Sequence, residues 1–573
     1  MKGAAGKEEF DVTEIKKKVV VAGALGNCVH VAGVVSFLRI AEEMGYETHF
    51  LGAAVPVEQW VEAVDRYQPD ILGVSYRLTP SVAIELIENL RDALGEKRLA
   101  TLKMAFAGTP PVCVVAEQSG LFEQCFTGLE HMNEARCLLG GTLYAVAQCK
   151  NSDSLLDRLK DSSPLPLIRH HFGLPDMDAT IQGVEEIAES GVLDIISLAP
   201  DQNAQQSFFR PDEMDRRMDG AGGAPIRSKV DLIRLREAAN HGNRPLLRIY
   251  SGTRDLIPWA EMSADTIKNA WGAVPLCWYS GLDGRSDRPL VQAIKENIET
   301  MRWYGRTTDS EWGEIPLEVN ESHHWSLREA HDTVAVVMAY LAAYNAKAAG
   351  VSHYIAQYMM NTPPTVTPAM DIAKMLAKIE LIESLHDSKF TTYRQVRAGL
   401  LHLSPRECVA KGQLATSTAF ALQLKPHIIH VVGYCEGDHA AEAKDVIESC
   451  DIVHGTIRNC FYGQPDFSFD ATIQKRKRVL LIEAKQLLAA IQKIGQNQQD
   501  PFTDPDTLAM AIKTGLLDAP HLKGNPFAAG ELETRAVGGA IYAWCRKEER
   551  ILSEEERISQ IMNAEKGGTR WVV

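Results

Sequence analysis

An apolar run that opens into a glycine-bearing loop near the N-terminus constrains this chain most. Residues 19–25 read VVVAGAL, and Gly26, His30 and Gly33 follow. A run this rich in β-branched residues is typical of a parallel strand buried on both faces. The apolar residues after Gly33 recur with helical spacing. We therefore expect His30 in a strand-to-helix loop, at the carboxyl edge of a sheet where ligands bind.

The composition excludes several classes of protein. The chain has 573 residues and a net charge of −15, which does not suit a nucleic-acid-binding protein because phosphate backbones need clustered Lys and Arg. The length alone suggests roughly three or four units. Its 11 cysteines are odd in number and contain no C-x-x-C pair, so we expect buried free thiols.

We expect a cytoplasmic protein with no membrane partner. The N-terminus lacks an apolar signal region. The longest apolar run, 334–344, is about half of the roughly 20 residues that a membrane span needs.

The first part of the chain, residues 1–150, alternates strand-like and helix-like segments. After the opening loop come strand-like runs at 47–51, 71–75 and 102–107, with helical stretches at 57–67 and from Ser81. This alternation predicts a doubly wound parallel sheet. The polar, proline-bearing stretch 151–165 that follows is expected to be a linker.

A dinucleotide is a poor ligand for this sheet. Binding NAD would require G-x-G-x-x-G and an acidic residue at the end of the second strand. The glycines here are Gly23, Gly26 and Gly33, and the second strand ends in Phe50-Leu51-Gly52.

Three short motifs point instead to a corrinoid. Cys28-Val29-His30-Val31-Ala32-Gly33 is followed by Ser75 and by Ala107-Gly108. These residues resemble the cobalamin-binding domain of B12-dependent mutases and methyltransferases, whose first loop reads D-x-H-x-x-G. The resemblance implies a flavodoxin-like fold in which His30 ligates cobalt and the cofactor tail lies along Ser75 and Gly108. Cys28, Gly33 and Thr109 complete the residues that we expect around the cofactor.

One position departs from that family. Cys28 stands where the family has an Asp that accepts a hydrogen bond from the ligating histidine. A thiol with a pKa near 8.5 is mostly neutral at pH 7 and does this less well. Three alternatives stay open: His30 ligates more weakly, Asn27 replaces the Asp, or no protein group ligates the cobalt. In the last case His30 is an ordinary loop histidine.

The region 166–465 contains eight strand-like runs separated by helical stretches. They are residues 167–172, 193–198, 246–250, 274–279, 315–319, 353–358, 390–393 and 428–434. Eight such units predict a (β/α)8 barrel. The remaining residues, 466–573, are expected to be a mostly helical extension that caps the barrel.

The active face of such a barrel lies where its strands end. Polar residues at those ends suit a small anionic ligand, because arginine can hold a carboxylate with two parallel hydrogen bonds. We single out Arg248, Tyr279, Arg285, Glu321 and Glu436 as candidate catalytic residues. Arg248 lies inside an apolar strand, where a charge is rarely buried without a partner. The pair His323-His324 is a poor metal site, since neighbours on an extended chain point to opposite faces.

The barrel region also resembles the large subunit of glutamate mutase. The residues that carry this resemblance are 248–253 (RIYSGT), 430–436 (HVVGYCE) with 448–450, and 515–522 (GLLDAPHL). It implies an adenosylcobalamin-dependent isomerase that rearranges a small carboxylate or amino acid through a radical. Arg248 and Arg285 would hold the carboxylate, and Glu318, Glu321 or Glu436 would be a polar or basic partner.

Two other functions are compatible with the motifs. A corrinoid methyltransferase usually has a helical cap before the sheet, whereas only about 15 residues precede the first strand here. A non-catalytic cobalamin-binding, storage or sensor protein would explain Cys28 but not the polar strand ends. The sequence leaves open whether a homodimer forms through the barrel.

Overall fold

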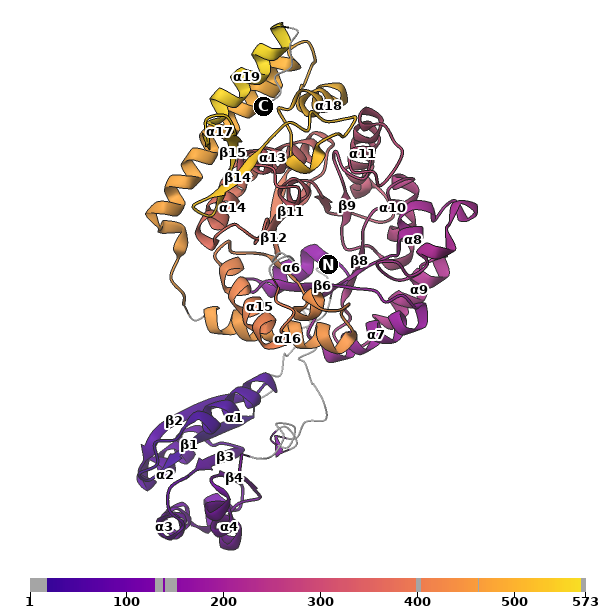
Figure 1. The fold of residues 1–573 in the computed structure, drawn as a ribbon. Coiled ribbons are helices and arrows are strands. Elements are labelled where there is room, and N and C mark those ends of the chain that lie inside the picture. The colour runs from indigo at the N-terminus through magenta and orange to yellow at the C-terminus, as the bar shows by residue number, and fades with distance from the viewer. Residues whose placement is uncertain are drawn as a thin grey trace, which may run out of the picture. The chain divides into compact units, whose positions relative to one another are not determined.

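The computed structural model describes residues 18–128, 135, 138–139, 152–397, 403–461 and 463–567. The chain divides into two compact units, residues 1–150 and 151–573 (Figure 1). Each unit is described by itself.

The first unit is a five-stranded parallel sheet in the order β2-β1-β3-β4-β5. Its strands are β1 (Val19–Leu25), β2 (Glu47–Val55), β3 (Ile71–Ser75), β4 (Lys103–Ala107) and β5 (Gln124–Phe126). The helices are α1 (Ala32–Glu43), α2 (Val57–Tyr67), α3 (Pro80–Leu99) and α4 (Pro110–Ser119). This strand order is the flavodoxin-like one, so the predicted fold class is confirmed. The short edge strand β5 was not predicted, and its three residues are only half-buried.

The position of β1 explains why its loop is exposed to ligands. β1 pairs with β2 on one side and with β3 on the other. The chain therefore reverses its direction of winding at β1 and β3, and the loops that follow these strands diverge from each other. Such a switch point leaves a crevice at the carboxyl edge of the sheet.

The second unit is a barrel of eight parallel strands, as the sequence predicts. The strands are β6 (Leu167–Phe172), β7 (Ile195–Leu198), β8 (Leu246–Ile249), β9 (Gly272–Val274), β10 (Leu317–Val319), β11 (His353–Met359), β12 (Thr391–Arg397) and β13 (Ile428–Val431). Each strand lies beside its neighbour in sequence, and β13 pairs with β6. The seam between β8 and β9 is bridged by backbone hydrogen bonds from Ala270 N to Leu247 O (2.9 Å) and from Ser251 N to Ala273 O (3.3 Å).

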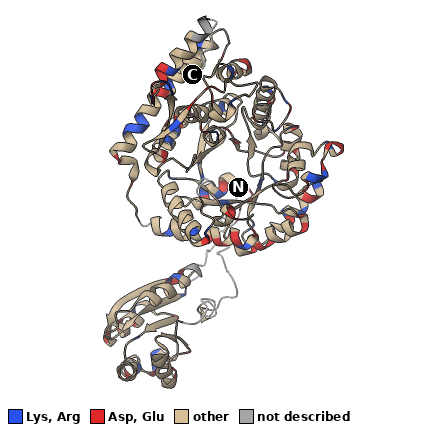
Figure 2. Cartoon of the chain, in the orientation of Figure 1, with Lys and Arg blue, Asp and Glu red and all other residues tan. Residues whose placement is uncertain are grey.

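Helices surround the barrel (Figure 1). They are α7 (Met177–Ser190), α8 (Gln202–Ser207), α9 (Lys229–Ala238), α10 (Leu256–Ile267), α11 (Leu290–Tyr304), α12 (Ser322–Leu327), α13 (Asp332–Ala348), α14 (Pro368–Glu383), α15 (Glu407–Leu422) and α16 (Ala443–Phe461). Acidic residues recur on α7 (Figure 2). This helix packs against α16.

The fourth barrel strand ends earlier than the sequence predicts. We expected a strand over 274–279, but β9 ends at Val274. The backbone N–H groups of Leu276 and Cys277 donate to the Glu321 carboxylate (3.0 Å each) instead of to a neighbouring strand. Tyr279 has a φ of 58°, a left-handed conformation that ends any extended run.

The polar segment 151–165, expected to be a linker, contains the helix α6 (Leu155–Ser162). Leu155 and Leu159 are buried in one cluster with Leu167, Ile195 and Ile428, which lie at the amino ends of their strands. This helix therefore closes the amino end of the barrel, and the opposite end carries the loops that follow the strands.

The C-terminal part packs on the outside of the barrel. The helix α17 (Ala471–Ile494) contacts α13 and α14, and its apolar residues Leu480 and Leu487 belong to the barrel's largest core cluster. After α18 (Pro505–Thr514), strands β14 (Thr534–Val537), β15 (Ala540–Cys545) and β16 (Arg550–Ile551) form an antiparallel sheet that was not predicted. The last helix is α19 (Glu554–Gly567). Among the described residues, no helix is both long and apolar enough to span a bilayer.

Candidate functional site

The loop after β1 presents His30 at the carboxyl edge of the first sheet. Gly26 follows the strand with a φ of +66°, and a Cβ there would lie 2.5 Å from the Leu86 side chain, so only glycine fits this turn. The helix α1 begins at Ala32, directly after the loop. His30 is exposed. Its ring is therefore available to a ligand rather than part of the core.

Cys28 lies behind the histidine. Its side chain is fully buried, and Sγ lies 3.8 Å from Nδ1 of His30. This is the contact that the D-x-H pattern assigns to a carboxylate. A thiol is a weak donor and a weak acceptor, so it orients the ring less firmly than a carboxylate would. Among the described residues, the side-chain contact of the His30 ring is with Cys28 rather than with Asn27.

Small residues occupy one face of the sheet beside this loop. Ser75 pairs in register with Ala107, and Gly73 pairs with Ala105. The alternate positions on these two strands carry the large side chains of the opposite core, Leu72, Val74, Met104 and Phe106. A Cβ on Gly73 would lie 3.1 Å from Phe37 of α1, which identifies the small-residue face as the one beneath α1.

Gly33, Gly108 and Thr109 differ in what they contribute. A Cβ on Gly33 would meet no atom within 4 Å, so this position borders open space. A Cβ on Gly108 would lie 2.7 Å from the Tyr76 carbonyl oxygen, so the chain's own packing already requires this glycine. Thr109 directly precedes α4, and its carbonyl accepts from the N–H groups of Val112 and Cys113 (2.9 Å each).

The barrel interior contains a buried cluster around one carboxylate oxygen. Oε2 of Glu318 accepts from Arg248 Nη2 (3.2 Å), Trp271 Nε1 (2.8 Å) and Gln395 Nε2 (3.1 Å). Arg169 Nη1 is 3.8 Å from the same oxygen. Arg248, Arg169 and Glu318 are all fully buried. Arg248 therefore has a buried carboxylate partner as expected, but that partner belongs to the chain itself.

This cluster carries more positive than negative charge. Two guanidinium groups face one carboxylate, and burial, followed by repulsion from Arg248, lowers the pKa of Arg169 to about 9. Nε and Nη1 of Arg248 and Nε of Arg397 have no hydrogen-bond partner among the described residues. Buried N–H donors of charged groups are costly to leave unpaired. The barrel is therefore suited to an anionic ligand.

Five histidines lie at the carboxyl ends of the strands, four of them buried and His171 half-buried, and all are held neutral. Burial is the main cause that lowers each pKa, and nearby arginines, Arg397 in particular, add to it. They are His170, His171, His323, His324 and His430. His171 stacks on Tyr250, and the Tyr250 hydroxyl lies 2.6 Å from its Nε2.

His323 should make the barrel sensitive to acid. Its folded pKa is about 3, below an ordinary value of 6.5, so the unfolded chain binds the proton first and stability falls as pH drops from 6.5 toward 3. Between pH 7 and 5 this residue should cost about 2 kcal/mol of unfolding free energy. Denaturant unfolding of the wild type and His323→Gln at both pH values should show that difference. The same pH dependence in the wild type and in His323→Gln would contradict the assignment.

Tyr279 and Arg285 lie together at the end of the fourth unit. The Arg285 guanidinium lies over the Tyr279 ring, 4.8 Å from its centroid, and is itself exposed. The Tyr279 ring is buried against His324, and burial raises the pKa of its hydroxyl to about 12. Tyr279 is therefore a neutral donor at pH 7, held in a left-handed backbone conformation of the kind that clusters at functional sites.

The two remaining candidate catalytic residues, Glu321 and Glu436, already hold parts of the chain in place. Oε2 of Glu321 accepts from the backbone of Leu276 and Cys277, and Oε1 accepts from Trp325 Nε1 (2.8 Å). Burial raises the pKa of Glu321 to about 7. Glu436 is exposed, accepts from the Gly433 N–H (3.2 Å) and lies 3.8 Å from His170 Nε2. Both residues orient loops, and Glu436 also faces a histidine of the barrel.

Sequence reasoning missed Arg169 and Gln395 and misjudged the His323-His324 pair. Arg169 lies inside the predicted strand 167–172, as Arg248 lies inside the predicted strand 246–250, but two histidines follow it and make its strand less apolar. The two histidines lie on helix α12 rather than on an extended chain, and their ring centroids are 4.3 Å apart. The expectation that they point to opposite faces is therefore wrong.

Comparison with known proteins identifies the first unit. Residues 18–126 match the family model of the B12 binding domain. The chain therefore contains a cobalamin-binding domain, and the barrel lies outside the match. No curated protein matches the chain.

Two solved structures are similar to parts of the chain. A novel cobalamin-binding protein from Desulfitobacterium hafniense DCB-2 is 29% identical over 19% of this chain and 53% of its own, with a TM-score of 0.18. The chain thus spans about half of that protein. The cobalamin-dependent S-adenosylmethionine radical enzyme OxsB, with aqua-cobalamin and S-adenosylmethionine bound, is 11% identical over 86% of this chain and 71% of its own, with a TM-score of 0.17.

Proposed function

We propose that this chain is an adenosylcobalamin-dependent isomerase that rearranges a small carboxylate or amino acid inside its barrel. The observation that carries this proposal is the buried excess of positive charge, in which Arg169 and Arg248 share one carboxylate, Glu318. A binding or storage protein would gain nothing from burying two guanidinium groups at this cost. The B12-binding match at residues 18–126 supports the cofactor class.

The first unit fits cobalamin on observations of its own. His30 would ligate the cobalt, with Cys28 behind the ring at 3.8 Å. The small-residue face that includes Ser75 and Ala107 would hold the tail, and Gly33 borders open space. When bound, adenosylcobalamin supplies radical chemistry through its cobalt–carbon bond.

The barrel residues would bind and orient the substrate. The unpaired donors of Arg248 and Arg397 can each give a charge-assisted hydrogen bond to a carboxylate. The five neutral histidines leave the arginines as the main positive charges. The neutral Tyr279 hydroxyl, together with the exposed Arg285, would contact a second polar group of the substrate. The apolar residues of α6 pack against the amino end of the barrel, so the substrate would enter from the opposite end.

Electron paramagnetic resonance of the full chain tests this function. With adenosylcobalamin and a small amino acid or dicarboxylate such as glutamate, we expect an organic radical coupled to cobalt(II). The radical should be absent without substrate, and proton NMR should detect a rearranged carbon skeleton. Arg397→Met should weaken substrate binding by about 30-fold or more, because a buried charge-assisted contact is worth at least ~2 kcal/mol. Bound cobalamin with no radical for any acid would instead support a non-catalytic binder.

A further inference from the structure

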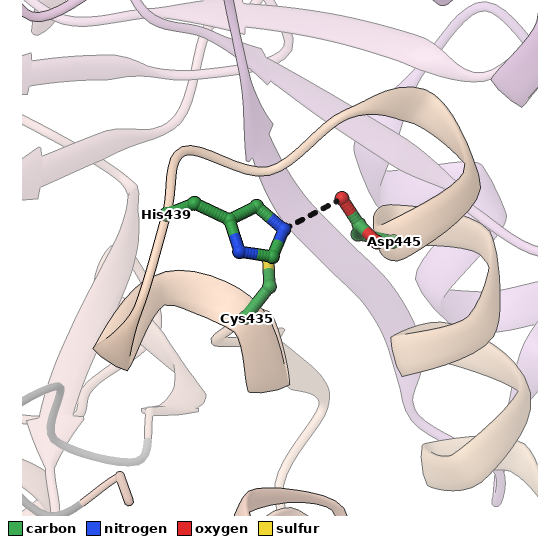
Figure 3. A group of neighbouring side chains, drawn as sticks. All are labelled: Cys435, His439 and Asp445. Carbon is green, nitrogen blue, oxygen red and sulfur yellow. Dashed lines mark ion pairs between the residues drawn. The ribbon is translucent and has the colours of Figure 1, made fainter. Parts of the chain in front are cut away.

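The loop between β13 and α16 brings together three different metal-binding side chains. Cys435 lies in the short helical turn after β13, His439 in the loop, and Asp445 in the first turn of α16. Their ligand atoms all lie within 4.8 Å of one another, and His439 Nε2 is 3.4 Å from Asp445 Oδ2. Figure 3 shows the three side chains converging from these separate segments. The cobalamin domain and the barrel interior described above use none of them.

The orientation of these side chains is fixed by a second layer of contacts. The other ring nitrogen of His439, Nδ1, lies 3.0 Å from Asp438 Oδ2. The other oxygen of Asp445, Oδ1, accepts from the Tyr434 hydroxyl (3.2 Å), and the Glu442 N–H donates to Oδ2 (3.0 Å). A carboxylate on the far nitrogen of a histidine is the arrangement that orients histidine ligands in metal sites. A simple surface ion pair between His439 and Asp445 does not need it.

We propose that Cys435, His439 and Asp445 bind a zinc-class divalent cation. Thiolate, imidazole and carboxylate together match the ligand preferences of Zn²⁺, and tetrahedral ligands about 2.0–2.3 Å from the metal lie roughly 3.3–3.8 Å apart. The pair His439–Asp445 already has this separation. Cys435 and Asp445 are buried, and His439 is exposed with Nε2 turned toward Asp445.

Three protein ligands leave a fourth coordination position for water or a small ligand. The three residues line a cavity of about 420 Å³, whose other walls include Ser404, Glu407, Lys444 and Glu448. An open position facing a cavity is the pattern of zinc sites that activate water or bind a ligand group, whereas structural zinc sites are closed by four protein ligands. The site follows the last barrel strand, at the same end as the histidine cluster.

Metal binding by the full chain, prepared without cobalamin and stripped with a chelator, tests this proposal. After Zn²⁺ is added back and the excess is removed by gel filtration, we expect the protein to retain a single equivalent of Zn²⁺. With Co²⁺ it should show the sulfur-to-cobalt charge-transfer band of a thiolate ligand. Cys435→Ser should lose that band and the stoichiometric metal, whereas Cys545→Ser should keep both. Asp438→Asn should weaken Zn²⁺ binding by about 10- to 100-fold.

Three results would overturn the proposal. The first is no stoichiometric metal in the wild type. The second is metal that survives Cys435→Ser but is lost in His241→Ala, which would place it at the exposed group of Glu185, Glu189 and His241. The third is that Cys435→Ser lowers the melting temperature by the same amount with and without Zn²⁺. That result would mean that the thiol contributes only through packing. None of these measurements involves cobalamin or turnover, so they stand apart from the proposed isomerase activity.

Discussion

Replacing Glu318 by Ala is expected to destabilise the barrel by about 3–5 kcal/mol, the cost of leaving a buried charge without its partner. Glu318 is the carboxylate that Arg169 and Arg248 share, and both arginines are fully buried. Its removal would also leave the Trp271 and Gln395 donors without their acceptor. The midpoint of denaturant unfolding, followed by far-ultraviolet circular dichroism, measures this loss.

A double variant separates the charge effect from simple loss of packing. Adding Arg248→Met to Glu318→Ala removes one of the two positive charges and should recover part of the lost stability. If Arg248→Met instead lowers the free energy of unfolding of Glu318→Ala, as an ordinary core substitution would, the repulsion between the two buried arginines is not what destabilises Glu318→Ala. A carboxylate ligand should stabilise Glu318→Ala more than the wild type, because it can replace the missing charge.

Under the proposed function, the charge cluster would also select the ligand of the barrel. Arg248 keeps two unpaired donor groups even when it is bound to Glu318. A carboxylate would satisfy them and neutralise the excess charge, whereas a neutral or cationic ligand would leave both costs in place. The neutral histidines add donors and acceptors without adding charge. The barrel should therefore discriminate by charge first and by shape second.

Much of the fold could be predicted because its signals are local. The apolar strands of the barrel and the helices between them follow from β-branched runs and helical spacing, and each predicted strand has an observed counterpart. The early end of β9 could not be predicted, because it depends on Glu321, which accepts from Leu276 and Cys277 across more than forty residues of sequence. The hairpin of β14 and β15 did have a signal: Gly538-Gly539, with φ of 57° and 81°, suits a tight two-residue turn.

The candidate site could be predicted less completely than the fold. His30 and Cys28 are two residues apart, so their pairing is visible in the sequence. The partner of Arg248 is 70 residues away, and only the register of the barrel brings Glu318 to it. The same holds for Arg169 and Gln395, which lie on β6 and β12. The position of Arg248 inside an apolar strand correctly predicted a buried polar partner. It could not show that this partner is Glu318.

His30→Ala is expected to change the bound cofactor more than any other single substitution in the first unit. Without the imidazole, the cobalt would lose the protein ligand that we propose for it, and the visible spectrum should shift to that of a form with a different lower ligand. The half-buried His49, which stacks on Tyr67 in the same unit, provides the matched control as His49→Ala. Cys28→Asp should strengthen His30 ligation, because a carboxylate accepts from the ring nitrogen better than a thiol does.

The most direct test of cobalamin binding through His30 is electron paramagnetic resonance of the cobalt(II) form bound to the full chain. One sample carries histidine labelled with ¹⁵N and the other carries ordinary histidine. Ligation by His30 predicts that the nitrogen splitting of the cobalt lines is a triplet in the unlabelled protein and a doublet in the labelled protein. In His30→Ala the label should have no effect. A triplet that persists in the labelled wild-type protein would show that the cofactor's own base, not His30, ligates the cobalt, and would contradict this account.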